Sequence, residues 1–525
     1  MKNLKDNIDN QITSGKNISF WTDSFTPPLI YVKPDKNYNT DVVIVGGGIA
    51  GITIAYCLLK SGKKIVLVED GQIGSGETGR TTAHLVNALD DRYYDLERIY
   101  GEEATKLIAK SHSDAIDFVE QIITEENIAC DFKRVDGYLF LHPSDKIESL
   151  EKELDAAGKA GINVRQVANV PGMKNESSVS LLFPRQGQFH PMKYLLGLSK
   201  AITKMGGQIF TGTHAKEIDE TGVITDDGIR IKADYIVVAT NSPVNNKVVM
   251  HLKQYPYRTY VIAATIKKRS LPSALWWDTG DQEKDIPPYH YARTHSYNEE
   301  YDLLICGGED HPTGLADNEK IAEEERYALI EAWTRTRFDI EEIIYRWSGQ
   351  VMEPMDSLAY IGKNPLDKDN VFIVTGDSGN GMTHGTIAGK LITDLINGKE
   401  NPLEKIYNPS RFKFFKSGMT FLKEFGGGLA AYLKTYPKDA DAITLSSIKP
   451  GEAEIVELNK KKHGAYRDEN NQLHIVNAEC THLQCIIKWN NDEKSWDCPC
   501  HGSRFTFRGE VINGPANKNL DYFSE

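Results

Sequence analysis

The chain of 525 residues lacks any long apolar run. No stretch approaches the roughly 18 apolar residues that a membrane-spanning helix needs. Residues 1–22 are polar and contain neither the apolar core of a secretory signal nor paired arginines. We therefore expect a protein without a membrane span that resides in the cytoplasm.

The chain also has little positive charge relative to its negative charge. It carries 61 Lys and Arg residues against 74 Asp and Glu residues, a net charge of −13, and it has no long run of basic residues. Nucleic-acid-binding proteins present clustered basic residues, so we expect no nucleic-acid partner. The hydrophobic share of 40% is that of a globular protein, and the length predicts about two to four domains.

Cysteine is scarce, with seven residues in the chain. Cys57, Cys130 and Cys306 are scattered through apolar or mixed segments, and we expect them to be buried free thiols. This distribution excludes a secreted scaffold held together by many disulfides. The remaining four cysteines all lie between positions 480 and 500.

Those cysteines belong to two short loops that each offer one thiolate and one imidazole. A structural zinc, a mononuclear centre and an iron–sulfur centre can all use two Cys and two His ligands. Each loop carries an additional cysteine, Cys485 or Cys500, and in each loop a Cys precedes a His. Both Cys ligands can therefore share one iron and both His ligands the other, which favours a [2Fe–2S] centre over zinc. The predicted ligands are Cys480, His482, Cys498 and His501.

The C-T-H-L-x-C and C-P-C-H-G-S sequences around these ligands resemble the Rieske family. The resemblance implies a disulfide between Cys485 and Cys500, which conflicts with a reducing cytosol unless burial protects it. Gln484 stands where the family usually has Gly, which leaves the geometry of that disulfide less certain. Phe505 stands where respiratory members have a Tyr that hydrogen-bonds a ligand sulfur. Because such hydrogen bonds raise the reduction potential, we expect a potential below that of the respiratory proteins.

Residues 41–69 predict a dinucleotide-binding unit of strand, glycine-rich turn, helix and second strand. Gly46 permits the tight turn, Gly48 lets a pyrophosphate approach the backbone, and Gly51 packs the helix on the strand. Glu69 ends the second strand, where it would accept hydrogen bonds from ribose hydroxyls. A second fingerprint of this kind is absent, so the sequence gives no support for an NAD(P)H-dependent reductase. Neither a Ser-His-Asp order nor a hydrolase elbow is present.

Other segments resemble flavoproteins of the D-amino-acid-oxidase/glycine-oxidase superfamily, and this resemblance implies FAD. The polar loop 74–84 resembles the segment that meets flavin and pyrophosphate, and residues 370–382 resemble the closing FAD motif, at a helix start. Residues 206–218 resemble the crossover strand near the adenine. The resemblance assigns cofactor contacts to Arg80, Thr81, Thr82, Ala215, Gly376, Asp377, Gly381 and Met382.

Residues 250–345 resemble the sheet that covers the flavin in this superfamily. An arginine on such a strand often holds a substrate carboxylate, because guanidinium offers a bidentate fork. Surface ion pairs and packing within the sheet are the alternative for each candidate, and His84 is similarly favoured as a loop neighbour over a catalytic base. The candidate catalytic residues are Arg258, Tyr291, Arg293 and His311.

Together the motifs resemble bacterial two-domain FAD/Rieske oxidoreductases over roughly residues 40–520. This implies an α/β fold, a Rossmann-like FAD domain with an α+β substrate domain, followed by an all-β Rieske domain. We also expect residues 96–160 to be helical. The predicted division is an arm (1–39), an FAD-dependent domain (40–410, with FAD-binding parts at about 40–95, 185–245 and 346–400 and substrate-side parts at about 96–184 and 246–345), a linker (411–442) and a Rieske domain (443–525).

The expected function is that of an FAD-dependent dehydrogenase of an amine or amino acid, which passes electrons between FAD and the [2Fe–2S] cluster. A one-electron carrier protein would be a further partner. Two alternatives stay open: an oxygen-using oxidase in which the Rieske domain serves for docking, and a redox sensor without catalytic activity.

Overall fold

The computed structural model describes residues 15–25, 30–174, 179–245, 248–281, 286, 288–315, 321–413 and 445–524. Most of the predicted linker, residues 414–442, therefore lies outside the described residues, as do residues 1–14 and 26–29 of the predicted arm. No helix in the described ranges is long and apolar enough to cross a membrane. The cytoplasmic location stays a prediction.

The first layer is an eight-stranded sheet whose central strands run parallel. Along the second half of β1, alternate side chains enter two different cores: Val42 and Ile44 face one, and Val43 and Val45 face the other. A strand buried on both faces requires an unbroken apolar run, and the sequence has one here. The strands, in order across the sheet, are β16 (Tyr360–Lys363), β17 (Val371–Thr375), β10 (Arg230–Val238), β1 (Tyr38–Val45), β2 (Ile65–Val68) and β7 (Gln208–Phe210), with β9 (Gly222–Thr225) beside β10 and β8 (Ala215–Asp219) beside β9.

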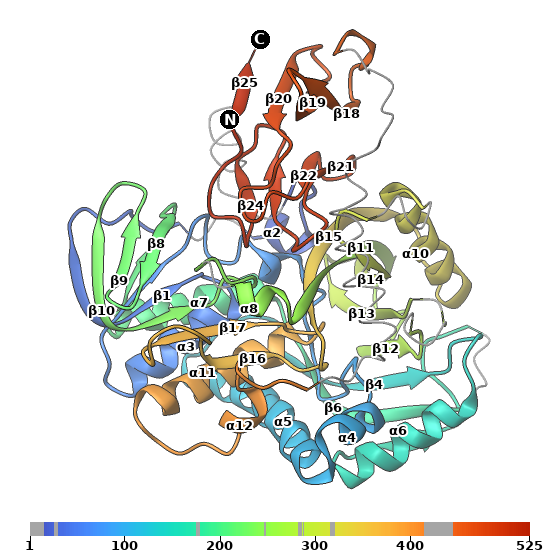
Figure 1. Ribbon diagram of the computed structural model, residues 1–525. Helices are drawn as coiled ribbons and strands as arrows, with labels where there is room; N and C mark the ends of the chain where they lie inside the picture. Colours follow the sequence, from blue (N-terminus) through green and yellow to red (C-terminus); the bar gives the residue numbers. More distant parts are fainter. Residues whose placement is uncertain are drawn as a thin grey trace.

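A group of helices packs against this sheet and against one another (Figure 1). They bury an apolar stripe at helical spacing, seen on the longest of them at Ile108, Ala115, Val119 and Ile122. The group consists of α3 (Ile49–Lys60), α5 (Glu102–Glu125), α7 (Pro191–Lys204) and α11 (Gly381–Ile396).

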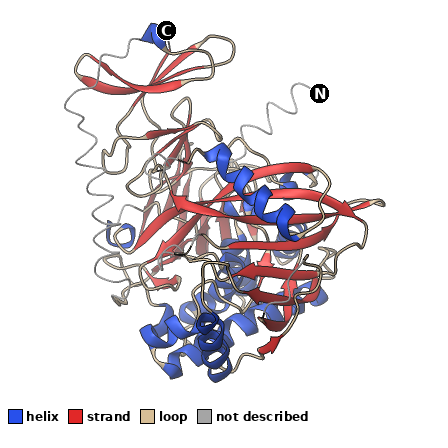
Figure 2. Cartoon of the chain, turned by 90° about the vertical axis from the view of Figure 1, so that its right-hand side faces the viewer, coloured by secondary structure: helices blue, strands red, loops and turns tan. Residues whose placement is uncertain are grey.

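The second layer is a nine-stranded sheet, and α10 (Glu323–Arg337) lies across it (Figure 2). The strands, in order, are β15 (Ile343–Pro354), β11 (Gln254–Lys267), β14 (Tyr301–Pro312), β13 (His290–Ser296), β12 (Ala274–Asp278), β4 (Lys133–Phe140), β6 (Ser180–Gln188) and β3 (His84–Leu85), with β5 (Arg165–Val167) paired to β6.

The expectation of helices throughout residues 96–160 is wrong in part. Gly101 has φ +83° and separates α4 (Tyr93–Tyr100) from α5, and β4 follows α5. α6 (Ile147–Lys159) is the next helix. β4 pairs with β6 and β12, far along the chain, so its strand conformation is set by partners that a local helical pattern does not reveal.

The C-terminal region forms two four-stranded antiparallel sheets stacked above the rest of the molecule (Figure 1). A small core containing Cys480, Cys498, Trp496 and Phe505 lies within it. The predicted fold class is thereby confirmed. The strands are β18 (Ala453–Leu458), β19 (Lys461–Arg467), β20 (Leu473–Asn477) and β25 (Tyr522–Ser524) in one sheet, and β21 (Lys488–Asn490), β22 (Ser495–Asp497), β23 (Arg504–Thr506) and β24 (Val511–Asn513) in the other.

Short segments complete the connections between the layers. Helix α2 (Phe20–Asp23) buries Phe20 and Trp21, and the Trp21 indole nitrogen donates to the carbonyl of Thr81 at 2.5 Å. The described part of the arm therefore packs on the polar loop 74–84. Two further single-turn helices are α8 (Val248–His251) and α12 (Glu404–Tyr407).

Candidate functional site

A cavity begins at the glycine-rich turn after β1 and extends to the nine-stranded sheet. Most of the predicted cofactor residues come together in its wall, although they come from five separate parts of the sequence. Gly51 and Gly376 do not line it. The predicted residues that do are Gly46, Gly48, Glu69, Arg80, Thr81, Thr82, Ala215, Asp377, Gly381 and Met382.

The turn between β1 and α3 has no room for side chains. A Cβ on Gly46 would lie 2.3 Å from the carbonyl oxygen of Ala239, and one on Gly51 would lie 1.9 Å from that of Gly46. Gly46 also has φ +109°, a conformation that L-residues rarely adopt. Gly51 thus acts outside the wall, by bringing α3 close to the turn, while Gly48 is the N-cap of α3. The turn leaves an open backbone cradle of the kind that receives a pyrophosphate.

Glu69 closes the far side of this cradle. Its carboxylate accepts hydrogen bonds from the amides of Gly47 at 2.6 Å and Gly71 at 3.0 Å. Burial raises the pKa of Glu69 to about 7, against the lowering effect of those amides. A half-buried carboxylate at this position fits a donor such as a ribose hydroxyl.

The opposite end of the cavity is acidic and aromatic. Tyr289 donates from its hydroxyl to Asp90 Oδ2 at 3.0 Å, and Tyr291 shares a hydrogen bond of 3.0 Å with Thr259 Oγ1. Burial raises the pKa of Asp310 to about 7, although Thr259 hydrogen-bonds to it. Burial also raises the pKa of Asp90. The sequence analysis missed Asp90, Tyr289 and Asp310, because none of them belongs to a motif.

Only one of the four candidate catalytic residues, Tyr291, lines this cavity. For Arg258 and His311 the physical reason is the two-residue period of a strand, which sends neighbouring side chains to opposite faces. Thr259 and Asp310 face the cavity, so Arg258 and His311 beside them do not. His311 instead shares a 2.9 Å hydrogen bond with the Tyr260 hydroxyl.

Arg293 is fully buried behind the cavity wall. Its guanidinium donates to the carbonyl oxygens of Thr82, Ala83 and Phe189 at 2.7–3.2 Å. These bonds hold the polar loop 74–84 onto the sheet. The placement fits the packing alternative for Arg293 rather than a contact with substrate.

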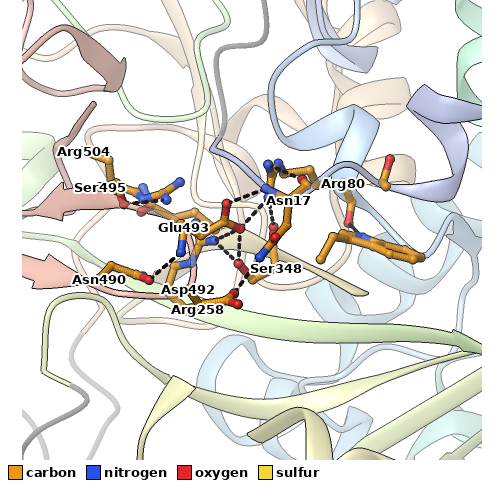
Figure 3. Close-up of polar contacts among 12 residues, drawn as sticks. Asn17, Arg80, Arg258, Ser348, Asn490, Asp492, Glu493, Ser495 and Arg504 are labelled. Carbon is orange, nitrogen blue, oxygen red and sulfur yellow. Dashed lines mark hydrogen bonds and ion pairs between the residues drawn. The ribbon is translucent and has the colours of Figure 1, made fainter. Parts of the chain in front are cut away.

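Arg258 belongs to a buried polar network that connects the part of the chain before residue 414 to the C-terminal region (Figure 3). Glu493 of the C-terminal region lies at its centre and is fully buried. The Glu493 carboxylate accepts from Arg80 at 2.8 Å, Ser348 at 2.5 Å and Arg258 at 3.2 Å. The Asn17 amide of the arm donates to its other oxygen at 3.0 Å.

The arginines of this network affect the pKa of Glu493 more strongly than its burial does. Burial alone would raise the pKa of Glu493, but Arg80, Arg258 and Arg504 lower it to about 2. Glu493 is therefore ionised at neutral pH and balances two buried guanidinium groups. Since Arg80 also lines the cavity, the network joins the wall of the cavity directly to the C-terminal region.

The four predicted metal ligands converge at one end of the C-terminal region. Cys480 and Cys498 are buried free thiols that hydrogen-bond to one another, and the rings of His482 and His501 have centroids 5.0 Å apart. His501 Nδ1 is buried and has no hydrogen-bond partner among the described residues, as expected of a nitrogen that binds a metal. Two soft thiols and two imidazoles, one with an orphaned nitrogen, fit a His2Cys2 iron–sulfur centre.

The other two cysteines of the loops, Cys485 and Cys500, form a disulfide. The sulfur atoms of Cys485, Cys498 and Cys500 lie within 4.8 Å of one another. Because the disulfide removes the thiols of Cys485 and Cys500, Cys498 alone among these three can act as a thiolate ligand. The remaining cysteines Cys57, Cys130 and Cys306 are buried and free, as predicted.

The cluster-bearing loops of the C-terminal region contact the part of the chain before residue 414. The loops next to them do so as well. Residues 511–514, 516 and 517 line the same cavity as the glycine-rich turn. Asn513 donates to Glu77 at 3.1 Å, and Asn517 donates to the carbonyl of Ala215 at 3.0 Å. Next to the cluster ligands, Gln350 donates to the carbonyl of Gly502 at 3.1 Å.

The fold and these two sites define a flavin-binding oxidoreductase joined to an iron–sulfur domain. Residues 41–395 match the family model described as FAD dependent oxidoreductase, and residues 440–524 match that of the Rieske [2Fe-2S] domain. The chain belongs to the FAD dependent oxidoreductase family, is an FAD-dependent oxidoreductase, and carries a C-terminal Rieske domain. FAD and a [2Fe–2S] cluster are its cofactors. The finer predicted domain boundaries and the roles of individual site residues stay predictions.

Some relatives share both domains and others share one of them. The putative Rieske 2Fe-2S iron-sulfur protein YhfW of Bacillus subtilis is 33% identical over 506 residues, 96% of each chain. The gamma-glutamylputrescine oxidoreductase of Escherichia coli is 24% identical, over 76% of this chain and 93% of its own. Among solved structures, glycine oxidase from Geobacillus kaustophilus superimposes with a TM-score of 0.56 at 18% identity, over 72% of this chain and all of its own.

Phe505 gives a prediction for the cluster. It is fully buried in the core that contains Cys480 and Cys498, and its ring offers no donor to a sulfur. We expect Phe505→Tyr to raise the midpoint potential of the cluster, because a phenolic donor near a ligand sulfur stabilises the reduced state. Protein-film voltammetry measures this shift. Phe507→Tyr, on a half-buried ring of the same domain, is the control, and equal potentials in all three proteins would contradict the argument.

Proposed function

We propose that the chain is a dehydrogenase that oxidises an amine and passes electrons between its FAD and its Rieske cluster. The observation that carries this proposal is the cavity wall shared by the two domains, with residues 511–514, 516 and 517 on one side and the glycine-rich turn on the other. A Rieske domain that served only to dock the protein elsewhere would not need to contact the flavin cavity. When bound, FAD accepts a hydride and the cluster accepts single electrons.

The charge of the cavity supports an amine rather than an amino acid. Among the described residues that line it, Arg80 is the one arginine, and its charge is already balanced by Glu493. No guanidinium among these described residues is left for a substrate carboxylate. Asp90 and Asp310 place two half-buried carboxyl side chains in the wall instead, an arrangement that an ammonium group would stabilise. The name of the Escherichia coli relative likewise contains an amine, gamma-glutamylputrescine.

The residues at the acidic and aromatic end of the cavity would have separate roles in amine oxidation. Conversion of an amine to an imine removes a hydride from carbon and a proton from nitrogen. Asp90, held by Tyr289, would bind the ammonium group, and Asp310 would accept the proton. Tyr291 and Trp277 would shield the reacting carbon from water, since both line the cavity and are largely buried.

The role of Asp310 predicts a pH dependence. Its pKa of about 7 means that the proton-accepting form becomes populated as the pH rises through 7, so flavin reduction by an amine should accelerate over that range. In Asp310→Asn the reduction rate should fall by about 100-fold and lose this dependence. Stopped-flow absorbance under anaerobic conditions measures both. The exposed Asp369→Asn is the matched control, and a variant that keeps the wild-type profile would rule out this role.

Anaerobic addition of amines and amino acids tests the function itself. Bleaching of the flavin followed by the EPR signal of the reduced cluster supports the proposed dehydrogenase. A flavin that bleaches while the cluster stays oxidised, with peroxide formed in air, favours the oxidase. No bleaching with any donor favours the sensor. A small one-electron carrier protein, the proposed external partner, should then reoxidise the cluster of the reduced enzyme.

A further inference from the structure

Helix α8 places an imidazole of the FAD-dependent domain against the cluster loops. His251 is 3% exposed, and its ring contacts both predicted imidazole ligands edge-on. The ring centroids lie 4.8 Å from His482, at an interplanar angle of 77°, and 6.0 Å from His501, at 64°. No motif of the sequence analysis contains His251, and neither the cavity nor the proposed amine oxidation uses it.

Both ring nitrogens of His251 are buried and have no hydrogen-bond partner among the described residues. Leaving a buried polar atom without a partner costs about 1–3 kcal/mol. A core histidine usually has its hydrogen bonds made within the protein. We therefore expect the His251 ring to make a hydrogen bond when the neighbouring cluster site is occupied. The groups that face it are the two ligand imidazoles.

The chemistry of a metal-bound imidazole supplies that partner. An imidazole that binds iron through one nitrogen carries its proton on the other, where it can only donate. A neutral imidazole such as that of His251 offers one acceptor nitrogen. His482, whose ring is nearer to His251, is thus the matching donor.

We propose that His251 is a positioning residue that accepts a hydrogen bond from His482 when the cluster is bound. The bond would fix the Rieske domain on the FAD-dependent domain, with the imidazoles of His482 and His501 facing that domain. It also tunes the cluster, because a hydrogen-bond acceptor behind a ligand imidazole makes that ligand a stronger electron donor. A stronger donor stabilises the oxidised cluster and lowers its midpoint potential.

Reductive titration of the cluster in the full-length protein, without any substrate, tests this proposal. His251→Phe and His251→Leu remove the acceptor, whereas His251→Gln retains one. We expect the first two variants to favour the reduced cluster by about tenfold, a rise of about 59 mV for a one-electron couple. The glutamine variant should stay nearer to the wild type, and the reduced-cluster EPR spectrum should change in the same order.

His463→Phe is the matched control, because His463 contacts Phe523 in the outer sheet of the same domain. Iron content is measured for each protein, and either acceptor-free variant that retains its iron decides the matter. Potentials equal to that of the wild type would overturn the proposal. A glutamine variant that shifts as far as the phenylalanine variant would also overturn it, because ring packing would then be the cause. Since no substrate is present, the result does not depend on the proposed amine oxidation.

Discussion

Glu493→Gln is expected to destabilise the contact between the two domains by about 3 kcal/mol. The substitution keeps the size of the side chain but removes the negative charge that balances Arg80 and Arg258 in a buried site. Removing one partner of a buried ion pair leaves the other charge uncompensated, which is the costly case. Because Arg80 lines the FAD cavity, we also expect the variant to hold FAD more weakly.

Thermal unfolding and FAD retention after gel filtration measure these two effects. The pKa of Glu493 is about 2, below its ordinary value of 4.5, so its stabilising contribution is complete above pH 4.5 and is lost as the pH falls toward 2. The stability difference between wild type and variant should shrink over that range. Glu457→Gln, on an exposed position of β18, is the control. Equal stability of Glu493→Gln and wild type at pH 7 would contradict this account of the network.

Gly51→Ala is expected to weaken FAD binding strongly. The added Cβ would lie 1.9 Å from the carbonyl oxygen of Gly46, and backbone atoms on both sides must move to admit it. Such overpacking costs about 1–3 kcal/mol or more. The displacement falls on the turn that cradles the pyrophosphate, so we expect FAD affinity to fall at least tenfold.

A second helical glycine provides the matched control for this substitution. Gly158 lies in α6, and a Cβ there would meet nothing within 4 Å. Gly158→Ala should therefore stabilise the protein by up to about 1 kcal/mol, the difference in helix propensity. Flavin absorbance of the purified variants and their unfolding temperatures separate the two cases. Full FAD occupancy in Gly51→Ala would show that the turn tolerates the shift.

The sequence predicted the cofactor machinery because that machinery is built from contiguous motifs. The glycines of the turn after β1 lie within six residues of one another. The four cluster ligands occupy two loops whose spacing is visible without a fold. In both cases the backbone conformation or the residue type is required locally, and the resemblance to known families rests on the same contiguous residues.

The substrate end could not be predicted in this way. The sequence offered Arg258 and His311 on strands β11 and β14 as candidates, but the register of the sheet turned Thr259 and Asp310 to the cavity instead. A shift of one residue along a strand reverses the face of every side chain. In the polar pairs Arg258-Thr259 and Asp310-His311 no apolar alternation shows which member faces the cavity. Asp90 reached the same place from a distant loop.

The sequence by itself determined that this protein binds FAD and a Rieske cluster and that its two folded domains follow in this order. The tertiary structure decided how the two cofactor sites are joined. Glu493 meets Arg80 and Arg258, and His251 meets His482, across more than 200 residues of intervening chain. Such pairs have no sequence signature, because each side chain alone is an ordinary charged or aromatic residue. Their interactions become strong because the side chains are removed from water and brought close together, and this happens only once the domains have packed together.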